Sequence, residues 1–370
     1  MGQLFGHTDP APDAGWTDAG PRKGFFTDTS ICIGCKACEV ACKEWNQLPA
    51  AGAGEGGGLL GSSYDNTGAL GADTWRHVAF IEQDSGRIAA ARESGRRLVD
   101  LGMPTLSPAA GGSMDGARSP RVDALAAAGA SDGIGAPGGA GAHAGLDVLG
   151  GTEGSAHPDT PEFRWLMASD VCKHCTHAAC LDVCPTGALF RSEFGSVVVQ
   201  DDVCNGCGAC VAACPFGVIE RRADGVSEPA RQRPQAEAVG HSQGGIAQKC
   251  TLCYDRLTEG EQPACAQTCP TESIRFGERD ELVERARRRV GQLHSQGMTE
   301  ARLYGANEND GVGGTGSVFL LLDEPEAYGL PPDPRVCTAD LPGMYARAGL
   351  AAAGMLAAAA LAFARRGGRA

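Results

Sequence analysis

Sixteen of the seventeen cysteines fall into four groups of four, and this feature constrains the fold more than any other. Two groups have the spacing C-x2-C-x2-C-x3-C; the others have C-x2-C-x4-C-x3-C and C-x2-C-x11-C-x3-C, and proline follows three of the four groups. The groups are Cys32, Cys35, Cys38 and Cys42; Cys172, Cys175, Cys180 and Cys184; Cys204, Cys207, Cys210 and Cys214; and Cys250, Cys253, Cys265 and Cys269. So many thiols must be oxidised, bound to metal or left reactive, and their spacing decides among these states.

The spacing favours iron–sulfur clusters. A C-x2-C-x2-C loop can place three thiolates around one cubane cluster, and in the bacterial ferredoxin pattern the fourth cysteine ligates the other cluster of a pair. Zinc is the competing interpretation, because two C-x2-C pairs can form a four-thiolate site, but zinc does not require the fourth cysteine before proline. Secreted disulfide scaffolds do not repeat one ligand set four times. The sequence therefore predicts four [4Fe-4S] clusters, arranged in pairs.

Lysine and histidine side chains between the cysteines admit two interpretations. They can tune cluster reduction potentials, because hydrogen bonds and positive charge stabilise a reduced cluster, or they can belong to solvated loops. These residues are Lys36, Lys43, Lys173, His174, His177 and Lys249. Cys337 has no neighbour at ligand spacing, and we expect it to be a free thiol.

Charge and motif content exclude several functions. The chain has 32 Lys and Arg against 45 Asp and Glu, a net charge of −13, so nucleic-acid binding is not expected. The segment GVGGTG at 311–316 matches a dinucleotide-binding pattern, but it precedes an apolar run instead of opening a helix. No nucleophile–base set stands out, so we expect no catalytic residue and no enzymatic activity from this chain alone.

The segments that carry the cysteines resemble a known family, the four-cluster electron-transfer subunits of molybdopterin oxidoreductases. Within it they are most similar to the beta (iron–sulfur) subunit of respiratory formate dehydrogenase. The resemblance rests on FFTDTSICIGCKACEVACKEWNQLP, on WLMASDVCKHCTHAACLDVCPTGALFRSEFGSVVVQDDVCNGCGACVAACPFGVIERR and on QKCTLCYDRLTEGEQPACAQTCPTESIRFG. It extends to SYDNTGALGADTWRHVAFIEQ and RLYGANENDGVGGTGSVFLLLDEPEAYGLPPDP, and so covers most of the chain outside the termini and one insertion.

The resemblance implies an interleaved pairing, in which the first group of cysteines works with the fourth and the second with the third. The implied ligand sets are Cys32, Cys35, Cys38 and Cys269; Cys42, Cys250, Cys253 and Cys265; Cys172, Cys175, Cys180 and Cys214; and Cys184, Cys204, Cys207 and Cys210. Each set would hold one of four [4Fe-4S] clusters.

The resemblance also implies a role and partners. A catalytic alpha subunit with a molybdenum or tungsten pterin would oxidise formate, and a membrane cytochrome b gamma subunit would pass the electrons to quinone. The alternative is the same role in another molybdopterin enzyme, a dimethyl sulfoxide, polysulfide or tetrathionate reductase. The sequences of the segments YDNTGALG and GVGGTGSVFLLLDEPEAYGLPP favour formate dehydrogenase.

The expected fold class is α+β, with two interleaved ferredoxin-like domains and one C-terminal transmembrane helix. Residues 189–202 read as a hairpin, short strands are expected at 217–220 and 273–276, and WRHVAFIEQ and VFLLLD should extend the sheets. The predicted parts are a disordered N-terminus (1–23), a domain from 24–103 with 240–280, a flexible Gly/Ala-rich insertion (104–160), an inserted domain (161–239), an extension (281–343) and the transmembrane helix (344–364). Within the extension, 281–296 is expected to be a solvated helix.

The C-terminal segment carries the membrane prediction. Residues 348–364 are apolar throughout, and at about 1.5 Å per residue they span roughly 25 Å; extension to Met344 approaches a bilayer core of about 30 Å. Arg365, Arg366 and Arg369 follow this segment, which places the C-terminus in the cytoplasm by the positive-inside rule. We therefore expect a membrane protein whose globular part lies on the extracytoplasmic side, with the cytoplasmic face as the alternative. Export would need a partner's signal, because the first 26 residues contain none.

Overall fold

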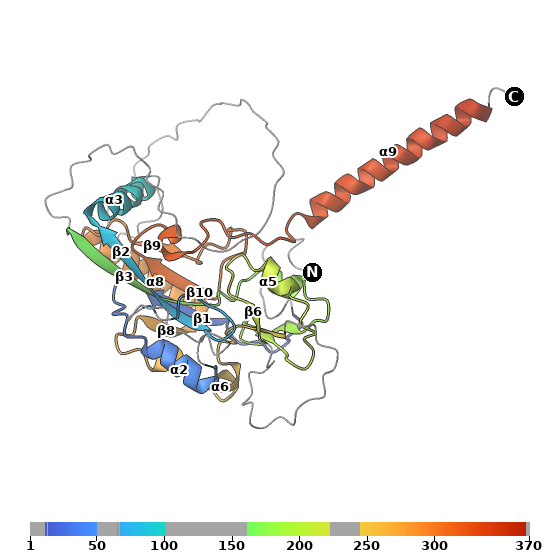
Figure 1. The fold of residues 1–370 in the computed structure, drawn as a ribbon. Coiled ribbons are helices and arrows are strands. Elements are labelled where there is room, and N and C mark those ends of the chain that lie inside the picture. Colours follow the sequence, from blue (N-terminus) through green and yellow to red (C-terminus); the bar gives the residue numbers. More distant parts are fainter. Residues whose placement is uncertain are drawn as a thin grey trace.

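The computed structural model describes residues 12, 14–49, 65, 67–100, 161–222 and 245–367. The predicted insertion at 104–160 and most of the predicted disordered N-terminus lie outside these residues. The described part is a mixed α/β structure of small sheets and mostly short helices, and one long C-terminal helix projects away from it (Figure 1).

A four-stranded sheet joins the two ends of the described chain. Its order is β8-β1-β10-β9, with β8 (Ile274–Glu278), β1 (Lys23–Asp28), β10 (Ser317–Leu321) and β9 (Arg302–Tyr304). β1 runs parallel to β10, with Phe25 opposite Ser317, and antiparallel to β8. All five residues of β10 are buried, as expected for a central strand that is covered on both faces. The predicted strands at 273–276 and VFLLLD are therefore present.

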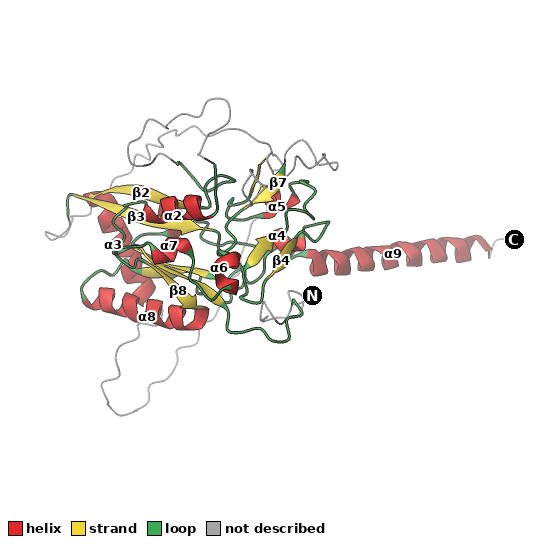
Figure 2. Ribbon diagram, turned by 90° about the horizontal axis from the view of Figure 1, so that it is seen from below, coloured by secondary structure: helices red, strands yellow, loops and turns green. Residues whose placement is uncertain are grey.

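Helix α8 (Arg279–Ser295) corrects one prediction. A helix was expected here, but as a solvated one with charge on most faces. The structure buries one stripe of it, formed by Leu282, Val283, Ala286 and Leu293, and this stripe packs on the four-stranded sheet (Figure 2). The stripe is narrow because arginine and glutamate occupy many of the remaining positions, and these charged residues concealed the amphipathic pattern.

A long antiparallel ribbon connects the chain on either side of the insertion. β2 (Arg76–Asp84) pairs with β3 (Phe163–Val171) over nine residue pairs, from Arg76 opposite Val171 to Asp84 opposite Phe163. Helix α3 (Ser85–Asp100) follows β2 directly. WRHVAFIEQ is thus a strand as predicted, but it forms a separate two-stranded sheet instead of extending the first.

Short elements and the loops next to them carry the cysteines. In chain order, β3 is followed by α4 (Ala179–Asp182), β4 (Leu189–Arg191), β5 (Val197–Val199), α5 (Ala209–Ala213) and β6 (Glu220–Arg222), which is a βαββαβ order. β4 and β5 form the predicted hairpin, whereas β6 pairs with β7 (Ile246–Gln248) and lies slightly later than expected. The remaining elements are α2 (Ala37–Trp45), α6 (Tyr254–Thr258), α7 (Ala264–Gln267) and the 3-10 helix η2 (Pro325–Tyr328).

Gly24 in β1 lies close to the backbone of Gly316, which comes directly before β10. A Cβ at Gly24 would lie 2.1 Å from the carbonyl oxygen of Gly316, whereas a Cβ at Gly277, its partner on β8, would lie 3.9 Å from Leu282. Gly24→Ala must therefore displace backbone, and we expect a loss of about 1–3 kcal/mol in stability. Gly277→Ala should be neutral or slightly stabilising. Urea unfolding of both variants measures the difference, and equal midpoints would contradict the prediction.

The C-terminal helix α9 (Leu341–Gly367) extends away from the sheets (Figure 1). Its apolar side chains are largely exposed, including Met344, Leu350 and Leu356. Within the part of the chain that the structure describes, no helix has both the length and the apolar character needed to cross a membrane. The transmembrane helix at 344–364 stays a prediction.

Candidate iron–sulfur cluster sites

The cysteine loops share a backbone feature. In each group, the residue two positions after the first cysteine has a positive φ angle: Gly34 (65°), His174 (45°), Gly206 (70°) and Leu252 (67°). Glycine adopts this conformation freely, whereas for His174 and Leu252 it is strained and requires support from the surrounding structure. Left-handed residues of this kind form concave backbone segments whose N–H groups bind anions, including iron–sulfur clusters.

Three thiols of the first group and one of the fourth line a common small cavity. These are Cys32, Cys35, Cys38 and Cys269, called here the first set. Burial raises the pKa of Cys38 to about 12, and it also raises the pKa of Cys32. Cys35 is exposed. The Thr271 hydroxyl lies 3.8 Å from Cys269 Sγ.

The second set joins Cys42 of the first group to three thiols of the fourth. Burial raises the pKa of Cys42, and the charges of Cys265, Cys250 and Cys253 raise it further. Burial also raises the pKa of Cys253 to about 12. Cys42 lies on α2 and Cys265 on α7, and these two helices pack together. The Leu252 N–H donates a hydrogen bond to Cys250 Sγ at 3.3 Å.

The third set combines three thiols of the second group with one of the third. Burial raises the pKa of Cys175, and the charges of Cys172, Cys180 and Cys214 raise it further. Burial also raises the pKa of Cys180 to about 12. These four thiols therefore lie within electrostatic range of one another in a desolvated part of the structure.

The segment 311–316 packs against the third set. Thr176 N–H donates to the Gly314 carbonyl at 3.0 Å, and His177 N–H donates to the Val312 carbonyl at 2.8 Å. The glycine-rich GVGGTG segment thus covers a cysteine loop, in agreement with its failure to fit a dinucleotide site.

The fourth set contains Cys184, Cys204, Cys207 and Cys210. Burial raises the pKa of Cys210 to about 11, with further contributions from Cys204, Cys184 and Cys207. Burial acts to raise the pKa of Cys184 as well, but hydrogen bonds with the backbone at Leu189 and at neighbouring residues bring it below its ordinary value. Cys207 is exposed.

Electrostatic interactions or helix contacts link each set to the next, and this order from the first set to the fourth is called here the row. In addition to burial, Cys265 of the second set raises the pKa of Cys38 in the first. In the same way, burial and then Cys172 of the third set raise the pKa of Cys250 in the second. The third and fourth sets share helices α4 and α5, which pack together. The exposed thiols, Cys35 and Cys207, lie in the two terminal sets of this row.

Buried cations accompany the thiols. Arg76, Lys173 and Lys249 are each only 1% exposed. Lys249 Nζ donates to the carbonyls of Val197 and Cys250, and Lys173 Nζ donates to the Asp170 carboxylate and the Val171 carbonyl. The solvated-loop interpretation is therefore wrong for Lys173 and Lys249.

His174 is buried too, and the solvated-loop interpretation fails for it as well. It is 2% exposed, and its Nδ1 accepts a hydrogen bond from the Val197 N–H at 3.1 Å. Burial, with Lys249 and nearby arginines, lowers the pKa of His174, so the ring is neutral and its proton is on Nε2. Lys36 and Lys43, by contrast, are half-buried.

These features fit an anionic cluster in each set. Left-handed residues in the loops, thiols in fours and buried cations are the backbone and charge pattern of iron–sulfur sites. The buried nitrogens Arg76 Nε, Arg76 Nη2 and His174 Nε2 also have no hydrogen-bond partner in the structure. Among the described residues, no group of three His, Cys, Asp or Glu side chains could hold a single metal ion; in a cubane, each thiolate binds a different iron.

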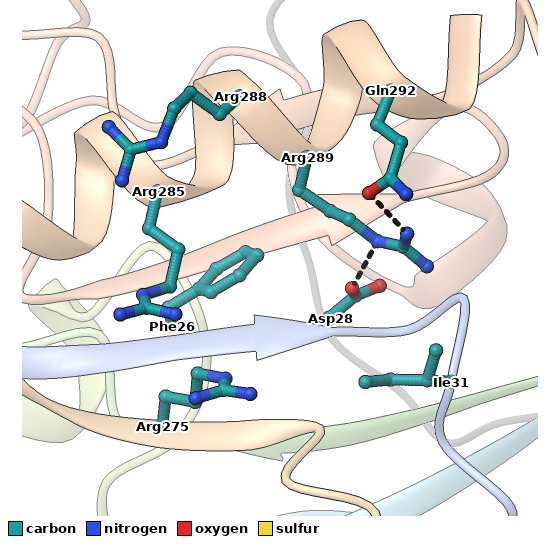
Figure 3. Close-up of a pocket in the computed structure, with 8 residues that line it drawn as sticks. All are labelled: Phe26, Asp28, Ile31, Arg275, Arg285, Arg288, Arg289 and Gln292. Carbon is teal, nitrogen blue, oxygen red and sulfur yellow. Dashed lines mark hydrogen bonds and ion pairs between the residues drawn. The ribbon is translucent and has the colours of Figure 1, made fainter. Parts of the chain in front are cut away.

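A groove rich in arginine borders the first set. Ile31, which precedes Cys32, and Arg275 on β8 line it together with three arginines of α8, namely Arg285, Arg288 and Arg289 (Figure 3). Arg289 is paired with Asp28 at 2.9 Å. Among the described residues, the side chains of Arg285 and Arg288 have no hydrogen-bond or ion-pair partner. The groove concentrates positive charge at this end of a chain whose net charge is −13.

Two family models match the chain. The model of the 4Fe-4S dicluster domain matches residues 163–229 and 225–279, and that of the 4Fe-4S binding domain matches residues 29–45. All four cysteine groups lie within these matches.

Known proteins extend the comparison to most of the chain. The formate dehydrogenase iron–sulfur subunit of Haemophilus influenzae is 30% identical over 88% of this chain and 73% of its own. The iron–sulfur subunit of the nitrate-inducible formate dehydrogenase of Escherichia coli is 31% identical over 89% of this chain and 79% of its own. A subunit of the anaerobic dimethyl sulfoxide reductase of Escherichia coli is 40% identical, but over only 30% of this chain and 45% of its own.

Proposed function

The chain belongs to the family of formate dehydrogenase iron–sulfur subunits, and on this basis we propose a path for electrons across it. It carries [4Fe-4S] clusters and transfers electrons, while the oxidation of formate belongs to a catalytic subunit of the same complex. The proposed path runs through the four thiol sets in the order first, second, third and fourth.

Each of the four sets is proposed to hold one cluster. When bound, a cluster supplies a group that accepts and releases one electron. The protein's own contribution is to hold four thiolates per cluster, to exclude water and to turn backbone N–H groups toward the sulfurs. The observation that carries the proposal is the row itself, in which buried sets adjoin one another and an exposed thiol lies at either end.

The catalytic subunit is proposed to dock at the first set. Cys35 is exposed there, and Ile33 and Val40 beside it are 59% and 58% exposed, so an apolar patch surrounds the shortest route to this set. The arginine-rich groove adjoins the same end and would attract an acidic surface of the partner.

The membrane partner is proposed to lie at the fourth set. Thr338, just before α9, donates a hydrogen bond to Asp182 on α4 at 2.8 Å, so α9 leaves the structure beside the third and fourth sets. We propose that α9 packs in the bilayer against a cytochrome b subunit, which would reduce quinone. By the positive-inside rule, the clusters would then lie on the extracytoplasmic side; the cytoplasmic face is the alternative.

The test is purification of the complex through a tag on this chain, from membranes solubilised anaerobically in mild detergent. We expect about 16 irons per chain, as four cubanes require, together with a large partner that contains molybdenum or tungsten and formate-dependent dye reduction. Recovery from the membrane fraction, with a haem-containing partner, would support the proposed acceptor side.

Other outcomes are distinguishable. A second outcome is the full iron content of about 16 per chain, combined with reduction of dimethyl sulfoxide, polysulfide or tetrathionate in place of formate oxidation. It would assign the chain to another molybdopterin complex. Recovery of the intact complex only from the soluble fraction would contradict the membrane partner. Iron well below 16 per chain in a freshly purified anaerobic sample would contradict the four-cluster path.

A further inference from the structure

Arg76 is a buried cation without a carboxylate partner. It begins β2, is 1% exposed, and its guanidinium lies 4.6 Å from the centroid of the Phe25 ring. Its hydrogen bonds go to Ser169, from Nη1 to Oγ at 2.9 Å and to the carbonyl at 3.4 Å. Among the described residues, Arg76 forms no ion pair with Asp or Glu. A buried arginine normally requires such an anion, because desolvation of an unpaired charge is costly.

The groups that Arg76 faces are cysteine thiols of two neighbouring sets, which become anionic thiolates when they bind iron. Cys38 belongs to the first set, and Cys265, Cys250 and Cys42 belong to the second; the charges of all four act on the guanidinium. Ser169 provides a direct link to the first set, because its Oγ lies 3.2 Å from Cys38 Sγ. Since Arg76 already donates to this oxygen, the Ser169 proton is free to point at the sulfur.

Two guanidinium nitrogens, Nε and Nη2, are buried and have no hydrogen-bond partner among the residues that the structure describes. Because arginine cannot lose its proton in a protein, these N–H groups need acceptors. A cluster with its thiolate ligands is anionic and carries sulfur acceptors, and the two sets that Arg76 faces are where such groups are proposed to bind.

We propose that the positive charge of Arg76 raises the reduction potentials of the clusters in the first and second sets. Reduction adds one electron, and so one negative charge, to a cluster without forming or breaking a bond. A fixed cation in a water-excluded site stabilises the reduced form more than the oxidised form. The inference rests on the proposed function for the existence of the clusters, but not for the identity of the substrate.

The test uses the complete purified complex and potentiometric titration followed by EPR. In Arg76→Met, which keeps the length of the side chain but removes its charge, we expect the reduction equilibrium constant of two of the four clusters to fall at least tenfold, which is 59 mV for one electron. Arg76→Lys should restore most of this shift. Arg302→Met is the matched control, because Arg302, on β9, is also buried but is paired with the Glu324 carboxylate.

The outcomes separate this inference from the proposed function. Four unchanged potentials in an Arg76→Met complex with full iron would overturn it, as would an equal shift of all four clusters. If Arg76→Met does not retain its clusters, Arg76→Gln, which also removes the charge, decides: lower potentials for two clusters support the proposal, and no change overturns it. Because EPR reads the clusters directly, a failure of formate oxidation would leave this result interpretable.

Discussion

Cys42→Ala is expected to reduce the iron content of the purified chain from about 16 to about 12, because one cubane loses a ligand. Cys265→Ala should give the same content, since both thiols belong to the second set. The double variant Cys42→Ala with Cys265→Ala should also retain about 12 irons, because the same cluster is lost. Cys38→Ala with Cys42→Ala should instead leave about 8, although these two residues lie on one helix, α2.

Each of these cysteine variants should keep one activity of the complex and lose another. Formate-dependent reduction of a dye at the catalytic subunit should survive, because those electrons need not cross the chain. Formate-dependent quinone reduction should fall to background, since the row of clusters is interrupted. Cys337→Ser, outside all four sets and exposed, is the matched control and should leave both iron and activity unchanged. About 8 irons in the Cys42/Cys265 double variant would contradict the interleaved sets.

Arg164→Met is expected to lower the free energy of unfolding by about 3–5 kcal/mol, because it leaves the buried carboxylate of Glu300 without its main partner. Arg164 Nη1 lies 2.7 Å from Glu300 Oε1, and Glu300 is 0% exposed. Arg92 also reaches this carboxylate, but at 3.8 Å. The other guanidinium nitrogens donate to Gln83 Oε1 and to the Leu322 carbonyl, so the substitution also removes one hydrogen bond within the ribbon and one between the ribbon and the segment after β10.

Urea denaturation monitored by the loss of cluster absorbance compares the relevant variants. Arg96→Met removes an exposed ion pair with Glu93, at 2.8 Å, and should leave the unfolding midpoint almost unchanged. Arg164→Met combined with Glu300→Gln should recover part of the loss, since no charge is then left unpaired. A midpoint for Arg164→Met equal to that of Arg96→Met would show that the buried pair is not needed for stability.

The sequence predicted those features that depend on local spacing. Four groups of cysteines, the hairpin after Cys184 and the strand before α8 follow from residues a few positions apart, and the structure contains the last two as expected. The burial of α8 was missed because its apolar residues are few and are separated by arginines. Its role depends on a sheet whose strands come from opposite ends of the chain.

The buried charges could not be predicted for a related reason. Arg76 stands in an apolar strand-like segment, and nothing near it in sequence shows that Ser169 and four cysteines surround it. The Arg164–Glu300 pair likewise joins residues far apart in the chain. Burial of a charge is set by long-range packing, so a single sequence shows the charged residue but not its environment.

The pairing of β1 with β8 and β10 has a consequence for biosynthesis. A ribosome completes β1 and the first cysteine group early, yet both neighbours of β1 lie near the other end of the chain. During most of translation β1 therefore has two unpaired edges, which expose it to aggregation. The second and third cysteine groups are close together in the chain and can fold sooner. We therefore expect the second and third cysteine groups to mature first, because the first set can bind its cluster only after Cys269 has been synthesised.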